Sequence, residues 1–420
     1  EYSFTVISLS PIMENALDGY HGYWVEDFFE VEQEFGDMED LKELIEEAHR
    51  RNIKVMLELV INYVAKTSPL VEEHPDWFKE VNVEPIKATE WLHEVVMFDQ
   101  SNPEVQNYLI DVAKFWMDTG IDGFKIHAAD QADVNFLHAF TKEIKEENPN
   151  FYLIATTLQG NEDVEFLYEI EQFDAIANEK VQKLLNEIFM KPDEEVSKLT
   201  DLRKSSASNR DLLFVDNKLT TRFSNHFAEY GRNEVTTWTL LLSYMYLTPG
   251  VPIIFQGSEI PTYGPEYPHN QYLVDFISAD PELKKVFQRL AALRKEFAPI
   301  IHGSFEEIAR EKGFSLFKRT YGDETVYVAI NNDSESRNVM IPSLGPDVQL
   351  RGLLHDDTIR ERENGEMLVG LNRESAEVFV IESNTGYNWP FISFVVGVFV
   401  IFAIIVSLLS RKQKKREKMN

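Results

Sequence analysis

Short apolar runs alternate with helical segments from residue 1 to about residue 303. The runs 5–12, 53–61 and 251–260 are rich in Val, Ile and Leu, and each predicts a buried strand. Residues 38–52 have apolar positions at helical spacing, which predicts an amphipathic helix. The expected buried face of that helix carries Leu41, Leu44, Ile45 and Ala48. Strands that alternate with helices are typical of an α/β fold with a parallel sheet covered by helices.

The pattern changes at Ser304, where short runs rich in Val, Phe and Tyr are separated by Gly, Asp and Asn turns. This texture predicts an antiparallel β-sandwich over residues 304–381, followed by a polar linker at 382–390. A polar, proline-containing excursion at about 65–98 is too long for an ordinary connection, so we expect a small subdomain inserted into the first domain, which covers 1–303.

An uncharged apolar segment follows the linker at residues 391–409 and has the length of one bilayer crossing. Residues 410–420 are basic, and the positive-inside rule places such a tail in the cytoplasm. A buried core helix is the alternative, but such a helix rarely lacks a polar face over five turns. We therefore expect a single-pass protein of the cell membrane, with both folded domains extracellular and the tail cytoplasmic.

Composition narrows the classes of partner. The chain has 41 Lys and Arg against 71 Asp and Glu, a formal net charge of -30, which argues against a nucleic-acid partner and disfavours acidic polymers. It contains no cysteine, so disulfides, thiolate metal sites and thiol nucleophiles are excluded.

Several motifs go further than the pattern. The segments YHGYW (20–24), 34–63, GIDGFKIHAA (120–129), FVDN with TTRF (214–223) and TPGVPIIFQGSE (248–259) resemble the alpha-amylase superfamily of glycoside hydrolases in order and spacing. The resemblance implies a (β/α)8 TIM barrel with a subdomain after its third strand and a C-terminal β-sandwich. In that frame, residues 5–12 correspond to the second barrel strand. We expect this barrel to be N-terminally incomplete, with an export signal and the first strand upstream of Glu1.

The resemblance also implies the chemistry of retaining glycoside hydrolysis, which needs two carboxyl groups about 5 Å apart. The family's nucleophile position is occupied by His127, its acid/base position by Thr156 and its third acid by Leu219. A threonine hydroxyl cannot protonate a glycosidic oxygen as a carboxylic acid does, and leucine offers only apolar surface. None of these three positions keeps the group that the reaction needs.

Residues near these three positions also differ from the usual pattern of the family that the sequence resembles. Lys125 replaces an orienting arginine, Tyr63 and Lys218 replace two histidines, and Glu58 replaces an aspartate. We therefore expect a catalytically inactive homologue, a pseudoenzyme that acts in glycan binding or as the partner subunit of a membrane protein. The alternative is an active hydrolase or transglycosylase on α-glucans with relocated catalytic groups. Asp130 and Glu259 are candidates for such groups, although both are more simply solvated or loop-capping acids.

Two further sites follow from the resemblance. Tyr23 and Trp24 correspond to a loop whose tyrosine stacks on a sugar ring, although packing of the loop onto the barrel top is the simpler explanation. Asn62 and Asp99 match positions that hold a structural calcium, and oxygen ligands suit that ion. Asn62 capping a loop is the alternative. The partners we expect are an α-glucan or another neutral glycan, or a membrane protein.

Overall fold

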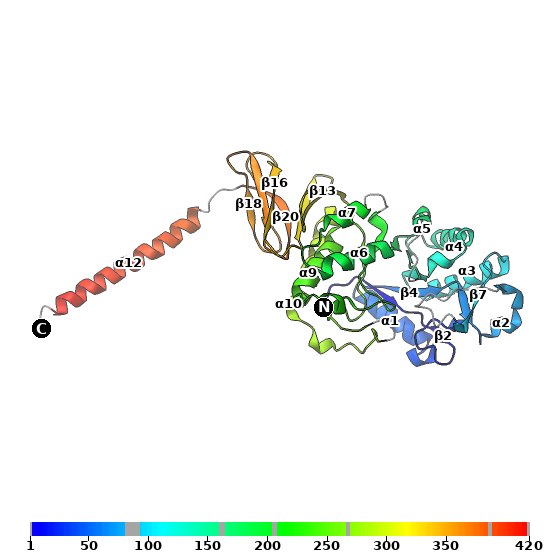
Figure 1. Cartoon of the computed structure of the whole chain (residues 1–420). Helices are drawn as coiled ribbons and strands as arrows, with labels where there is room; N and C mark the ends of the chain where they lie inside the picture. The colour runs from blue at the N-terminus through cyan, green and yellow to red at the C-terminus, as the bar shows by residue number, and fades with distance from the viewer. Residues whose placement is uncertain are drawn as a thin grey trace.

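Seven parallel strands form the central sheet of the computed structural model (Figure 1). The structure describes residues 2–79, 93–158, 164–203, 208–265, 269–384 and 389–417. The sheet has the order β1-β4-β8-β9-β10-β11-β12. Its strands are β1 (Val6–Leu9), β4 (Lys54–Val60), β8 (Gly123–His127), β9 (Tyr152–Ala155), β10 (Ala175–Ala177), β11 (Asp211–Leu213) and β12 (Val251–Pro252). Among the described residues, β1 and β12 are its edges, so the sheet is a TIM-barrel-like half-barrel.

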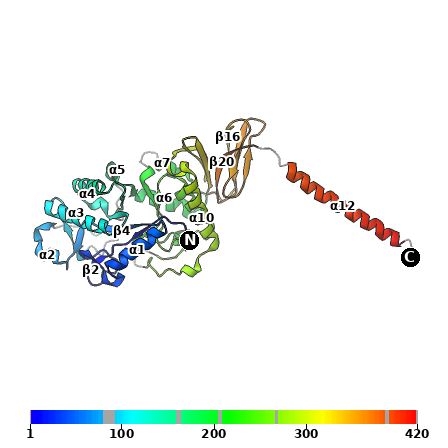
Figure 2. The same ribbon diagram turned by 180° about the vertical axis from the view of Figure 1, so that it is seen from behind.

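Helices follow most of these strands along the chain and cover the sheet (Figures 1 and 2). They are α1 (Met38–Arg50), α3 (Pro103–Asp118), α4 (Val134–Glu147), α5 (Glu165–Glu169), α6 (Glu179–Met190), α7 (Ser197–Arg203), α8 (Phe223–Ala228), α9 (Glu234–Leu247), α10 (Pro281–Glu296) and α11 (Ala298–His302). Asp37 caps α1 by accepting from the backbone of Glu39 and Asp40. The helix buries Leu41, Ile45 and Ala48 as expected. The prediction for Leu44 was wrong, since its side chain lies at the border of the buried stripe and is 39% exposed.

The apolar run 251–260 was predicted to be one strand, but β12 covers only Val251–Pro252. Its partner β11 has only three residues, and the pairing ends after Leu213 and Pro252. Gly257 then adopts a φ of 98°, in the left-handed region where glycine is favoured. The rest of the run is therefore a turn, because apolar composition alone does not supply a pairing partner.

Two small sheets lie in the connections after the first strands. The hairpin of β2 (Met13–Asn15) and β3 (Val25–Val31) holds the 16–24 loop. The excursion predicted at 65–98 contains α2 (Pro69–Glu73) and an antiparallel sheet of β5 (Tyr63–Ala65), β7 (Val95–Phe98) and β6 (Phe78–Lys79). Residues 80–92 of this predicted subdomain lie outside the described part of the chain.

An antiparallel domain follows the half-barrel. Its larger sheet has the order β13-β14-β15-β20-β17-β18, and β16 pairs with β19 in a second sheet. Residues of both sheets share one core, which includes Phe314, Tyr327, Val339 and Val369. The strands are β13 (Ser304–Glu311), β14 (Phe314–Tyr321), β15 (Glu324–Asn331), β16 (Arg337–Pro342), β17 (Val348–Gly352), β18 (Thr358–Arg360), β19 (Glu366–Leu371) and β20 (Ser375–Ser383).

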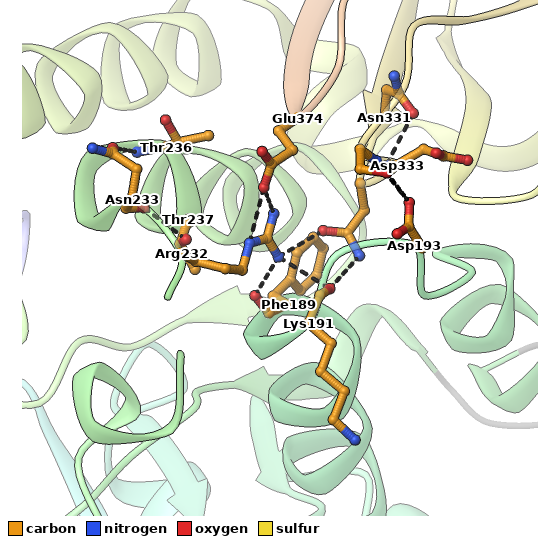
Figure 3. Close-up of polar contacts among 12 residues, drawn as sticks. Phe189, Lys191, Asp193, Arg232, Asn233, Thr236, Thr237, Asn331, Asp333 and Glu374 are labelled. Carbon is orange, nitrogen blue, oxygen red and sulfur yellow. Dashed lines mark hydrogen bonds and ion pairs between the residues drawn. The ribbon is translucent and has the colours of Figure 1, made fainter. Parts of the chain in front are cut away.

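Arg232, in the loop before α9, joins the two domains (Figure 3). Its guanidinium donates to the carbonyls of Phe189 and Lys191 at 2.7 and 3.1 Å, to Asn332 Oδ1 at 2.9 Å and to Glu374 Oε1 at 2.6 Å. The Arg232 side chain is 2% exposed. We call this arrangement the Arg232 junction, and its saturated hydrogen bonding indicates a structural role.

The last helix, α12 (Trp389–Glu417), carries the apolar segment of the chain. Its window Ile392–Leu409 has a mean hydropathy of 3.0 and is not buried by any other part of the structure. Length and composition suffice for a membrane crossing, which is weak support on its own. Residues 385–388 of the predicted linker lie outside the described residues.

Candidate functional site

The carboxyl ends of the parallel strands bring polar side chains of distant segments together. Register pairs Glu58 of β4 with Lys125 of β8, and Val60 with His127. Lys218 follows β11 and reaches the same edge, which we call the barrel mouth. Parallel strands end at a common edge, and in barrel folds this edge carries the functional loops.

One buried carboxylate lies at the centre of this edge. Glu58 Oε1 accepts from Lys218 Nζ at 2.6 Å and lies 3.1 Å from His127 Nδ1, while Oε2 lies 2.9 Å from Lys125 Nζ. The Glu58 side chain is 2% exposed, and those of Lys125 and Lys218 are 18% and 20% exposed. These four residues form the Glu58 cluster.

Charges set the protonation of this cluster. Burial opposes ionisation of Glu58, but the ammonium of Lys125 and the hydrogen bond with His127 lower its pKa overall. Burial lowers the pKa of Lys218 well below its usual value, but its side chain remains 20% exposed and its Nζ lies 2.6 Å from the Glu58 carboxylate, and both favour the charged form. Glu58 is therefore a carboxylate held between two ammonium groups.

Aromatic side chains line the cluster. Lys218 Nζ lies 3.6 Å from the centroid of the Tyr23 ring, a cation–π distance, and the Tyr23 and His127 rings are 4.6 Å apart. Tyr63 lies edge-on to His127 at 6.0 Å. Burial and the charges of Lys218 and His127 lower the pKa of His21 to about 4, so this neighbour is neutral at pH 7.

Comparison with known proteins decides the family. The family model described as Alpha amylase, catalytic domain, matches residues 1–95 and 90–291, and the Alpha-amylase C-terminal domain model matches residues 303–379. The chain belongs to the alpha-amylase family.

Its relatives within this family include solved alpha-amylases. An Anoxybacillus alpha-amylase is 34% identical, with a TM-score of 0.84 over 92% of this chain and 88% of that one. An alpha-amylase of Geobacillus thermoleovorans, complexed with acarbose, is 32% identical, with a TM-score of 0.83 over 91% of this chain and 89% of that one. Neopullulanase 2 of Thermoactinomyces vulgaris is 26% identical over 370 residues, which cover 81% of this chain and 62% of that protein. The chain thus spans less than two thirds of this curated relative.

The structure places the three predicted catalytic positions of this alpha-amylase-family chain around the mouth. His127 ends β8 inside the Glu58 cluster. Thr156 follows β9 and donates its hydroxyl to the Ile126 carbonyl at 2.9 Å. Leu219 is buried in the main hydrophobic cluster. Within this arrangement, Thr156 and Leu219 contribute backbone support and apolar packing.

The two predicted sugar-contacting residues differ in their surroundings. Tyr23 is buried, and one face of its ring carries Lys218. Trp24 is half-buried and packs edge-on against the His21 ring at 4.8 Å. The face of Tyr23 that carries Lys218 is thus taken by a side chain of the same protein.

The residues predicted to hold calcium make other contacts. Asn62 donates to the Ala128 carbonyl at 2.8 Å, and its Oδ1 accepts from Gln100 at 3.2 Å. Asp99 accepts from the hydroxyl of Ser101 at 2.7 Å. No group of three or more His, Asp or Glu suited to a metal occurs in the described part of the chain. Both residues are thus engaged by protein neighbours, and calcium at Asn62 and Asp99 stays a prediction from which we derive no step.

A second group of buried acids lies after β11 and β12. Asp216 accepts from Ser258 Oγ at 2.8 Å and from the Phe223 amide at 3.0 Å, and Glu259 accepts from the Gly257 amide at 2.7 Å. Burial raises the pKa of both carboxyl groups. Asp130, the other acid considered from the sequence, accepts from the Leu158 amide at 2.8 Å.

Sequence reasoning identified Glu58, Lys125, His127 and Lys218 one by one and missed that they form one cluster. Each was read as the loss of a family residue. The available signal was charge balance, since one acid and two lysines at neighbouring strand ends must pair when they are buried. Sequence reasoning also missed that Asp216 and Ser258 contact one another.

Proposed function

We propose that this chain recognises α-glucans without hydrolysing them by the retaining mechanism of its family. The observation that carries the proposal is the Glu58 cluster, in which the one carboxylate that the described residues place at the centre of the mouth is bound by Lys125 and Lys218. A glycoside hydrolase needs one carboxyl group that stays protonated and another that attacks or activates water. Glu58 is ionised and its two oxygens are engaged, so it suits neither role.

His127 and Thr156, the other polar groups at the predicted catalytic positions, do not replace the missing acid. His127 could act as a base or a nucleophile, but its Nδ1 faces Glu58. The Thr156 hydroxyl, bound to a backbone carbonyl, is far too weak an acid to protonate a leaving oxygen near pH 7. Binding of the substrate class can outlast loss of the reaction, because binding needs surface and hydrogen bonds rather than a pair of acids with separated pKa values.

The second candidate is an active hydrolase or transglycosylase on α-glucans. The comparisons favour it, since the alpha-amylase complexed with acarbose covers almost the whole chain at 32% identity. Within the chain, Asp216 and Glu259 are buried carboxyls with raised pKa values, as a general acid requires. Their hydrogen bonds to Ser258 and Gly257 point instead to a structural role.

One experiment separates these candidates. Full-length protein in detergent is mixed with maltoheptaose, soluble starch and an aryl α-glucoside, and both the melting temperature and the release of reducing sugar are measured. We expect maltoheptaose to raise the melting temperature while no sugar is released above the level of a boiled sample. Release that disappears in Glu259→Gln but persists in the exposed control Glu306→Gln would establish the second candidate instead.

The same measurement tests the partner-subunit reading. If maltoheptaose leaves the melting temperature unchanged and a membrane protein copurifies in stoichiometric amount, glycan recognition is the wrong function for the mouth. The fold would then serve as the extracellular part of a complex.

We further propose that α12 anchors the chain in the cell membrane, with the basic residues after Leu409 in the cytoplasm. Its support is the exposed window Ile392–Leu409 and the charge pattern that follows it. Carbonate extraction should leave the full chain in the membrane pellet. Protein that washes off at high pH would contradict the anchor.

A further inference from the structure

Two ammonium groups at the barrel mouth have more donors than the structure uses. A lysine ammonium has three N–H donors, and both Lys125 and Lys218 direct one of them to Glu58. Among the residues that the structure describes, Glu58 is the only hydrogen-bond acceptor recorded for either ammonium. Both side chains keep about a fifth of their surface exposed, 18% and 20%. Apart from the Tyr23 ring beside Lys218, the described residues therefore offer these two ammonium groups no further partner at a partly open edge.

The local charge has the opposite sign to that of the whole molecule. Within the Glu58 cluster, two ammonium groups and one carboxylate leave one positive charge, in a chain whose formal net charge is -30. Two further acids of the described part of the chain are bound elsewhere, since Asp216 accepts from Ser258 and Asp130 from the Leu158 amide. The sequence-based exclusion of acidic ligands rested on the overall charge and does not apply to this edge.

A buried hydroxyl lies beside the same cluster. The Tyr63 hydroxyl has no hydrogen-bond partner among the described residues, and the Tyr63 side chain is 3% exposed. Burial and the nearby charge of Glu58 raise its pKa, so it is a donor at every physiological pH. A buried donor without an acceptor is costly, and it marks a place where an acceptor would be favourable.

We propose that the barrel mouth binds an anionic glycan, whose phosphate or carboxylate group accepts hydrogen bonds from Lys125 and Lys218. This rests on the proposed function as a glycan-recognising protein and names the class of glycan. A neutral sugar would cover the two ammonium groups and offer them only hydroxyl acceptors. An anion supplies charge-assisted hydrogen bonds to both and balances the charge that Glu58 leaves over.

The test compares ligands that share a sugar and differ in charge. Full-length protein in detergent is titrated calorimetrically with glucose 6-phosphate, glucuronate, glucose and maltotetraose. We expect the better anionic sugar to bind at least about tenfold more tightly than glucose, the factor that one charge-assisted hydrogen bond supplies. The phosphate and carboxylate arms identify the anionic group. Equal binding of glucose and both anionic sugars would overturn the proposal.

Variants assign the effect to the two lysines. Lys125→Gln and Lys218→Gln should each remove most of the preference for the anionic sugar, and Lys218→Arg should restore much of it, because the charge returns. Lys142→Gln on α4 is the matched control, since its side chain is 68% exposed. Circular dichroism checks that each variant is folded. A preference that survives in folded Lys125→Gln and Lys218→Gln would contradict the assignment.

The outcomes separate this inference from the proposed function. Binding of an anionic sugar without binding of maltotetraose would remove α-glucans as the ligand and keep the anion site. Binding of maltotetraose without any preference for charge would keep the proposed function and overturn the anion site. Binding of none of the four sugars would overturn both.

Discussion

The barrel mouth and the Arg232 junction both bury cationic side chains, but they pair them differently. At the junction, Arg232 donates to two carbonyls, an amide oxygen and a carboxylate (Figure 3). In the Glu58 cluster, two ammonium groups share one carboxylate, and apart from the Tyr23 ring they have no further partner in the described part of the chain. The Arg232 guanidinium, bound by several acceptors, holds the two domains in place. The two ammonium groups, which share one carboxylate, are suited to bind a ligand.

The largest loss of stability should come from removing the cation of the Arg232 junction. Arg232→Met leaves Glu374, Asn332 Oδ1 and the Phe189 carbonyl without Arg232 as a donor, whereas the Lys191 carbonyl still accepts from Asn332. We expect the free energy of unfolding in urea to fall by about 3–5 kcal/mol. Arg351→Met is the control, because Arg351 and Glu382 form an exposed pair, worth less than about 1 kcal/mol. Similar losses in the two variants would show that the junction is not saturated in solution.

Removing the central carboxylate of the barrel mouth should lower the free energy of unfolding by a smaller amount. Glu58→Gln leaves two ammonium groups without their carboxylate, but both retain access to water, so we expect a loss of about 1–3 kcal/mol in the same urea titration. The triple variant Glu58→Leu, Lys125→Met, Lys218→Met removes all three charges together and should be close to neutral. A triple variant as unstable as Glu58→Gln would mean that the cluster is needed for packing rather than for binding.

Acid should act on the mouth through His21. Its folded pKa is about 4 against 6.5 in the unfolded chain, so the unfolded chain takes up a proton that the folded chain refuses. Stability should fall as pH drops from 6.5 to about 4 and then no longer change on account of this residue. Melting temperatures at pH 7, 5.5 and 4 test this, with His21→Asn expected to flatten the slope. An unchanged slope in that variant would place the acid sensitivity elsewhere.

Removal of calcium by a chelator should change the stability of the protein least. Calcium at Asn62 and Asp99 remains an untested prediction, and the hydrogen bonds of these residues to Gln100 and Ser101 argue against a preformed site. We expect EGTA to shift the melting temperature by no more than about 1 °C. A larger fall that added calcium reverses would instead establish the ion as part of the fold.

The order of the elements was predictable from sequence, because each strand and helix carries its own periodicity. The strands Lys54–Val60 and Gly123–His127 are mostly apolar, as buried parallel strands are, and their few polar residues include members of the Glu58 cluster. The point within the run 251–260 at which strand β12 ends was not predictable, because it depends on pairing with β11. Likewise, Leu44 fits the apolar stripe of α1 but lies at its border, which spacing alone does not reveal.

The candidate site was predictable as a set of residues but not as an arrangement. Motif spacing placed Lys125, His127 and Lys218 at strand ends. That Lys125 and Lys218 share Glu58 depends on the register of β4 with β8 and on the course of the loop after β11, both set by tertiary packing. The position of Lys218 over Tyr23 has the same origin.

The open side of the central sheet has a consequence for local opening of the fold. Among the described residues, β1 hydrogen-bonds to β4 alone, and its Val6 and Ile7 are each 40% exposed. β8 has a strand on either side and a buried interior. Backbone amides of β1 should therefore exchange with deuterium well before those of β8, so the half-barrel opens from this edge inward.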